Sequence, residues 1–241
     1  MKRIVAMVLS AALIFVLSGC QGENASTSNS DLHNGNSQIS SGESDNVPSL
    51  STDTTAGKVL IAYFTRVGNT DFPDDVDAIS SASLNLRNGT LAGNTELIAA
   101  MIQQETGGEL FRIQTEKKYP VDYNALVDYG QEEPDEDSRP VLQSHVENME
   151  EYDVIFLGYP NWWFDMPMAV YSFLEEYNLS GKTIIPFCTH GGSRFSDTIS
   201  KLEEILPDST ILEGFEVHGE RAADAEDDVA AWIDKLGIAT K

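Results

Sequence analysis

Two copies of a Gly-Asn-Thr triplet, at residues 68–70 and 93–95, could each bind a phosphate group. At the start of a helix such a triplet supplies unpaired backbone N–H groups with a hydroxyl side chain beside them. Apolar residues at helical spacing follow Thr95 at once, whereas acidic residues and a proline follow Thr70. We therefore predict that the second triplet opens the helix and that residues 67–92 form an insertion packed over the site. The alternative is a plain helix cap without a ligand.

A second stretch, Gly-Tyr-Pro-Asn-Trp-Trp at residues 158–163, places two consecutive tryptophans directly after a predicted strand. Because adjacent side chains cannot both face one interior, we expect one of them to stack on a flat ligand, a contact that contributes about 0.5–1.5 kcal/mol. Backbone N–H groups of this loop can also bond the nitrogens of a ring. The alternative is that Trp162 or Trp163 covers an apolar patch.

The third stretch, Thr-His-Gly-Gly-Ser at residues 189–193, follows another predicted strand. Its paired glycines let the backbone approach a ligand closely. His190 could donate a hydrogen bond or a proton to that ligand, because imidazoles change charge near neutral pH; it is equally a simple turn residue. We expect Cys188, at the end of the preceding strand, to be an inert core thiol.

Apolar runs alternating with amphipathic segments predict the elements that position these three stretches. The predicted strands are residues 58–64, 110–113, 152–158, 183–188 and a weaker one near 211–217. The predicted helices are residues 95–106, 167–177, 195–206 and 222–236. This alternation indicates a doubly wound parallel sheet of the α/β class, whose ligands bind beyond the carboxyl ends of the strands. The acidic, proline-containing stretch 117–140 is expected to be a solvated irregular crossover.

The N-terminal part has the pattern of an export signal. Lys2 and Arg3 precede an apolar run over residues 4–17, which is shorter than the roughly 20 residues that a membrane-spanning helix needs. The run ends in Leu-Ser-Gly-Cys, which resembles the lipobox of bacterial lipoproteins and implies cleavage before Cys20 and acylation of that cysteine; the alternative is an ordinary signal peptide. Residues 21–57 are polar and predict a flexible tether. The expected division is a signal at 1–19, a lipidated linker at 20–57 and a folded domain at 58–241.

Charge and cysteine content exclude several functions. The 241-residue chain has 39 acidic against 15 basic residues and a formal charge of -24, which argues against nucleic acid or a bare anionic membrane as its main partner. Two cysteines are too few for a disulfide scaffold or an iron–sulfur site. Redox chemistry would therefore require a bound organic cofactor.

Taken together, the three stretches and a final tryptophan-bearing helix resemble the flavodoxin-like family over residues 58–238. The resemblance implies a five-stranded parallel sheet of order 2-1-3-4-5 in a three-layer α/β/α arrangement, with one non-covalently bound FMN. It assigns the phosphate to Thr65, Arg66, Asn94 and Thr95. It assigns the isoalloxazine ring to the two later loops, with Pro160, Asn161, Trp162 and Trp163 on one and Thr189, His190, Gly191, Gly192 and Ser193 on the other.

These patterns lead to three functional expectations. The first is a lipoprotein that transfers electrons outside the cytoplasm, to a redox partner protein or a small acceptor, and touches the membrane only through its lipid. The second is an FMN-dependent reductase of quinones or other small acceptors, with His190 as proton donor. No Gly-x-Gly-x-x-Gly fingerprint occurs, which favours the carrier. The third is a surface binding module that keeps the fold without the cofactor.

Overall fold

A computed structural model describes residues 57–74, 76 and 83–238 of the chain. The predicted signal segment, the lipidation site Cys20 and the tether up to residue 56 lie outside these residues. Within the described part, no helix combines the length and apolar character needed to cross a membrane.

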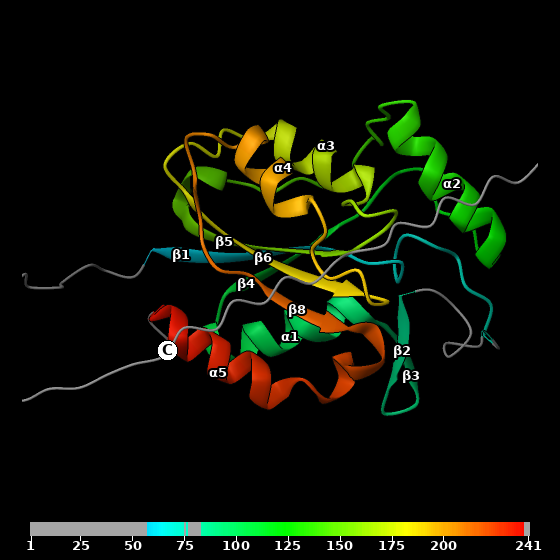
Figure 1. The fold of residues 1–241 in the computed structure, drawn as a ribbon, viewed down its shortest axis with the longest axis horizontal. Helices are drawn as coiled ribbons and strands as arrows, with labels where there is room; N and C mark the ends of the chain where they lie inside the picture. The colour runs from blue at the N-terminus through cyan, green and yellow to red at the C-terminus, as the bar shows by residue number, and fades with distance from the viewer. Residues whose placement is uncertain (1–56, 75, 77–82, 239–241) are drawn as a thin grey trace, which may run out of the picture. The chain divides into compact units, whose positions relative to one another are not determined.

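The centre of the structure is a parallel sheet with helices on both faces (Figure 1). Its strands lie in the order β4-β1-β5-β6, and β7 and β8 share the edge beside β6. The strands are β1 (Lys58–Phe64), β4 (Glu109–Ile113), β5 (Tyr152–Pro160), β6 (Thr183–His190), β7 (Thr210–Ile211) and β8 (Phe215–His218). This confirms the predicted order 2-1-3-4-5, with the fifth position divided between two short strands.

The apolar strands are buried because both faces of the sheet carry a hydrophobic layer. Successive residues of β1 alternate between them: Leu60 and Phe64 belong to one cluster, and Ile61 belongs to the other. Helices α3 (Met168–Glu176) and α4 (Thr198–Ile205) cover the first face, and α1 (Asn94–Thr106) and α5 (Glu226–Leu236) cover the second (Figure 1). All four predicted helices are therefore confirmed, although a short 3-10 segment, η2 (Gly219–Asp224), occupies the predicted start of the last.

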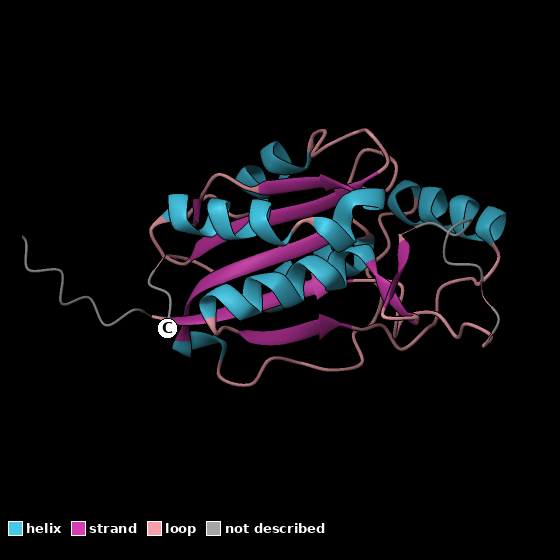
Figure 2. Cartoon of the chain, turned by 90° about the horizontal axis from the view of Figure 1, so that it is seen from below, coloured by secondary structure: helices cyan, strands magenta, loops and turns pink. Residues whose placement is uncertain are grey.

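The prediction of an irregular crossover over residues 117–140 is wrong. Helix α2 (Tyr123–Asp135) lies there, and the carboxylate of Asp122 caps it by accepting a hydrogen bond from the Ala125 N–H at 2.9 Å. Helix α2 has only a narrow buried side: Leu126 packs against the core, while most other side chains of the helix face solvent. The acidic residues of the helix obscure this side in the sequence. This side holds the helix at the end of the sheet to which the strand arrowheads point (Figures 1 and 2).

The insertion contains a short antiparallel hairpin of β2 (Leu84–Arg87) and β3 (Thr90–Gly93). Asn88 and Gly89 form its two-residue turn, with positive φ angles of 52° and 77°. These angles fit the tight turn that asparagine followed by glycine favours between twisted strands. The hairpin lies at the same end of the sheet as α2 (Figure 2).

Candidate functional site

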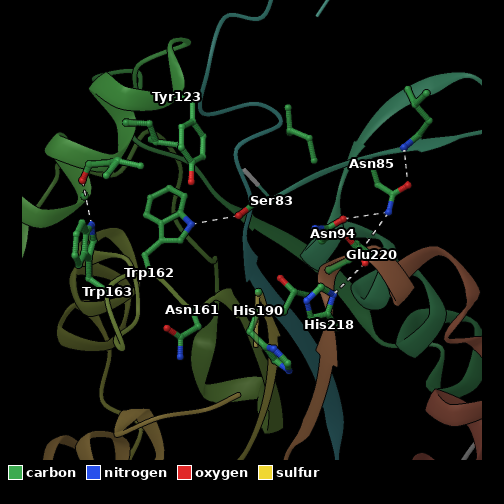
Figure 3. A pocket seen from close by; sticks show the side chains of 18 residues that line it. Ser83, Asn85, Asn94, Tyr123, Asn161, Trp162, Trp163, His190, His218 and Glu220 are labelled. Carbon is green, nitrogen blue, oxygen red and sulfur yellow. Dashed lines mark hydrogen bonds and ion pairs between the residues drawn. The ribbon is translucent and has the colours of Figure 1, made fainter. Parts of the chain in front are cut away.

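A cleft of about 1010 Å³ opens at the carboxyl ends of β5 and β6. Six parts of the chain line it: the β2–β3 hairpin, the start of α1, helix α2, the loops after β5 and β6, and the junction of β8 with η2. Figure 3 shows the indole of Trp162 on one side of this cleft and the side chains of Asn94 and His218 on the other. The start of α1 and the loops after β5 and β6 therefore meet at one place, whereas the predicted phosphate contacts Thr65, Arg66 and Thr95 are not among the described residues that line the cleft.

Both tryptophans of the loop after β5 line the cleft. Nε1 of Trp162 donates to Oγ of Ser83 at 3.2 Å, and the indole packs edge-on against Phe64 and Tyr119 at centroid distances of 5.4 and 5.7 Å. Nε1 of Trp163 donates to the carbonyl oxygen of Val127 at 3.0 Å, and the residue is 47% exposed at the mouth. Trp162 thus covers core aromatics on one side while lining the cleft on the other.

The turn that carries Trp163 is strained. Trp163 and Phe164 have φ angles of 52° and 66°, and mutual backbone hydrogen bonds of 2.9 Å between Trp162 and Asp165 close the turn around them. Each non-glycine residue in this region costs on the order of 1 kcal/mol. The carboxylate of Asp165 holds the turn by accepting from the hydroxyl of Tyr171 at 2.8 Å. Strain of this kind persists where the surroundings fix a conformation, which is common at ligand sites.

The two predicted phosphate-binding segments lie side by side. Helix α1 begins at Asn94 with Gly93 as its N-cap, so the prediction that residues 93–95 open the helix is confirmed. A Cβ placed on Gly93 would lie 1.7 Å from Oγ1 of Thr65, so the loop after β1 directly contacts the start of α1. Asn69 of the first triplet is buried and has a structural role instead: its Nδ2 donates to the carbonyl oxygens of Thr65 and Ile113 at 2.8 and 2.9 Å.

Buried polar groups gather at this contact. Thr65 and Thr70 bury their Oγ1 atoms without a hydrogen-bond partner among the described residues. Arg66 is also fully buried; its Nη2 donates to the carbonyl oxygens of Pro120 and Val121 at 3.1 and 3.2 Å. Burial lowers the pKa of Arg66 to about 10, so the guanidinium stays charged at neutral pH.

Asn94 and Thr95 connect this region to the other loops. Oγ1 of Thr95 lies 2.9 Å from Oγ1 of Thr189, which joins the start of α1 to the end of β6. The backbone N–H of Asn94 donates to the carbonyl oxygen of Ser83 at 3.0 Å, and its Oδ1 accepts from Nδ2 of Asn85 at 3.2 Å. Asn94 thus anchors the hairpin, and Thr95 anchors the loop after β6.

The loops after β5 and β6 hold each other in place. The N–H of Asn161 donates to the carbonyl oxygen of Thr189 at 2.8 Å, and its Nδ2 donates to that of Arg194 at 2.8 Å. Asn161, Thr189, His190 and Gly191 line the cleft. The remaining predicted ring contacts are Pro160, Gly192 and Ser193. They lie next to lining residues in the sequence but are not among the described residues that line the cleft.

The ring nitrogens of His190 are both engaged. The backbone N–H of Gly192 donates to Nδ1 at 2.9 Å, so Nδ1 is the unprotonated nitrogen, and Nε2 donates to the carboxylate of Glu216. The side chain is 6% exposed. To act as a proton donor, His190 would first have to break one of these bonds. Cys188 beside it is buried, and burial raises the pKa of its thiol, which confirms the expected core role.

Sequence reasoning missed two parts of the lining, the residues of α2 and residues 218–220. Residues 83–86 belong to the insertion predicted to pack over the site, although the hairpin that they help to form was not predicted. Asp122 and the Asn88-Gly89 pair were usable signals for the helix and the hairpin. Gly130 of α2 lies close to the tryptophans, where an added Cβ would make ordinary contact with Trp162 at 3.7 Å. His218 carried no such signal, because it is the last residue of an ordinary short strand, β8.

Known proteins resemble most of the chain. A family model described as flavodoxin matches residues 88–236. A candidate flavoprotein from Bacteroides eggerthii is 28% identical with a TM-score of 0.57, and the alignment covers 76% of this chain and 99% of that one. One from Bacteroides uniformis is 28% identical with a TM-score of 0.56, covering 74% and 99%. A Lactobacillus acidophilus flavoprotein in complex with FMN shares the fold at 17% identity and a TM-score of 0.50, covering 73% and 99%. No curated protein matches the chain.

Proposed function

The chain belongs to the flavodoxin family, and from that premise we propose that it binds one FMN non-covalently in the cleft and transfers electrons through it. The observation that carries the proposal is the contact between the hydroxyl of Thr65, which has no hydrogen-bond partner among the described residues, and the start of α1, whose first residue, Asn94, lines the cleft together with both tryptophans. A structure of similar fold was solved with FMN. FMN, when bound, supplies one- and two-electron redox chemistry.

The residues at the phosphate end fit such a ligand. A buried hydroxyl without a partner costs about 1–3 kcal/mol, and a phosphate oxygen would accept its hydrogen bond. Three cations lie near this loop in a chain whose formal charge is -24: Arg66 is buried in it, Nζ of Lys118 donates to the Gly68 carbonyl oxygen at 2.6 Å, and a Cβ on Gly68 would lie 3.1 Å from Arg112. Arg112 is paired with Glu96, whose carboxylate also accepts from the N–H of Gly93, so the excess of positive charge rests on Arg66 and Lys118. This local charge supports a dianionic group at this point.

The residues at the ring end fit a flat, partly polar ligand. The indole of Trp162 is fixed by its contacts with Ser83, Phe64 and Tyr119, so it can stack on a ring without losing further freedom. Asn161 and the loop after β6 supply polar groups beside it. The Thr65 hydroxyl also favours FMN binding over the third expectation, a module without cofactor, because a phosphate oxygen would accept its hydrogen bond.

We also propose that the protein acts outside the cytoplasm as a lipoprotein anchored through Cys20. The support is the sequence pattern of residues 1–20 and the polar tether that follows. Its electrons would pass to a redox partner protein or a small acceptor. In cells fed labelled palmitate, wild-type chain should carry label in the membrane fraction and Cys20→Ser should not. Label retained by the variant would contradict the anchor and leave FMN binding untouched.

The proposed cofactor is tested by the visible absorption spectrum of the purified full chain, taken before and after adding FMN and gel filtration. We expect flavin bands to remain with the protein and tryptophan fluorescence to fall, because Trp162 and Trp163 line the cleft. A colourless protein after gel filtration would overturn the proposal and leave the fold standing.

A further inference from the structure

We propose that His218 is the proton donor to a planar, conjugated electron acceptor of the quinone class that binds in the same cleft as the flavin. This inference rests on the proposed FMN binding. The cleft measures about 1010 Å³, at the upper end of the roughly 300–1,000 Å³ that small-molecule sites span, and its lining includes Tyr123 and His218, which the proposed flavin contacts do not use.

Two histidines reach this part of the molecule, and they differ in the hydrogen bonds that their ring nitrogens already make. Their rings meet edge to face at 5.9 Å. His190 is committed to Gly192 and Glu216, as described above. His218 is 40% exposed, lines the cleft, and has Nδ1 3.9 Å from the carboxylate of Glu220. Its Nε2 has no hydrogen-bond partner in the described part of the chain, so that nitrogen is the one available to a ligand.

The charged groups around His218 are few. Glu220 of η2 faces Nδ1 and is itself 89% exposed. Glu216 of β8 is committed to His190 and to Arg194, whose Nη1 lies 2.8 Å from it. From β2 and α1 the facing groups are the neutral amides of Asn85 and Asn94, the first of which donates to the carbonyl oxygen of Gly219 (Figure 3).

The opposite wall suggests the class of acceptor. Tyr123, which is 49% exposed, presents aromatic surface there, beside the face of Trp162 that the flavin ring would cover (Figure 3). Flat, conjugated molecules stack on such a wall, and their polar edge would then point across the cleft toward His218. A quinone has this shape and takes up protons when it is reduced, so it needs a donor at its oxygen.

The reaction balances with the residues named. FMN, if bound in its reduced, anionic form, would supply the hydride, that is two electrons and one proton, and would be left oxidised. A quinone oxygen uses one of its electron pairs to form an O–H bond with the proton on Nε2 of protonated His218, whose N–H bond breaks. The products are a hydroquinone and neutral His218, which regains its proton from water.

The test uses the full chain loaded with FMN and the probe tetramethyl-p-benzoquinone. After anaerobic reduction with dithionite, stopped-flow mixing with the quinone gives the rate of flavin reoxidation between pH 5 and 9. We expect His218→Gln to lower the rate at pH 6 by about 100-fold and to remove its fall at high pH. His145→Gln is the matched control, because His145 is exposed and pairs with Glu176 away from the cleft.

A second readout does not depend on turnover. In the oxidised protein, the imidazole NMR signal of His218 should shift when the quinone is added, and that of His145 should not. The role of His218 is overturned if His218→Gln keeps the wild-type rate and pH profile, or if the quinone leaves the His218 signal unmoved. In either case FMN binding stands. A wild-type chain that retains no FMN overturns the proposed function and this inference together.

Discussion

Thr65 is the residue at which the phosphate end of the cleft can be tested most directly. Its hydroxyl is buried, faces the start of α1 and has no partner in the described residues. Thr65→Ala should weaken FMN binding at least about 10-fold, since a hydrogen bond to a charged group contributes about 1.5–3 kcal/mol. Thr65→Ser keeps the hydroxyl and should stay within a few-fold of wild type. Fluorescence titration with FMN measures both, and equal losses in the two variants would argue against a hydroxyl contact.

Gly93 tests the close approach on which this geometry depends. A Cβ at this position would lie 1.7 Å from Oγ1 of Thr65, a distance that forces the loop away from α1. We expect Gly93→Ala to lower both the free energy of unfolding, by about 1–3 kcal/mol, and the FMN affinity. Gly130→Ala is the control, because its added methyl group would meet Trp162 at an ordinary 3.7 Å. Urea denaturation that finds the two variants equally stable would contradict the contact.

At the scale of elements, helix α2 buries a carboxylate against the rest of the fold. Glu133 is 4% exposed and accepts a hydrogen bond from the hydroxyl of Tyr119 at 3.2 Å. Burial raises the pKa of Glu133 to about 7. Because this value lies above that of an unfolded glutamate, the folded state binds more protons between pH 4.5 and 7, and stability falls as pH rises through this range.

Glu133→Gln should therefore become more stable than wild type as pH rises. The two proteins should unfold at similar urea concentrations near pH 4.5, and by pH 8 the variant should gain up to about 3 kcal/mol, because it buries no charge. Glu132→Gln on the exposed side of α2 should follow the wild type throughout. Parallel curves for Glu133→Gln and wild type would show that the carboxylate is solvated in the folded protein.

The same elements show how far the sequence could be interpreted. Strands such as β1 and β5 were predictable because they are buried on both faces and are therefore continuously apolar. Helix α2 was missed because its buried side is narrow and one of its members is the carboxylate of Glu133. The site was only partly predictable. Trp162 and Trp163 could be assigned to it because they directly follow a predicted strand. His218 could not, because it reaches the cleft through the pairing of β8 with β6, which is a long-range contact.

At the scale of the whole molecule, the acidic charge should set the potential of the bound flavin. A chain of formal charge -24 opposes the addition of negative charge, so we expect the couple that forms the fully reduced flavin to lie below that of free FMN. The cations near Gly68 act at the phosphate end, and they favour binding in every oxidation state. Salt screens exposed charges over about 10 Å at 0.1 M, so raising the salt should bring the potential closer to that of free FMN. A redox titration at low and high salt checks this, and a potential no lower than that of free FMN would mean that contacts within the cleft, rather than the surface charge, dominate.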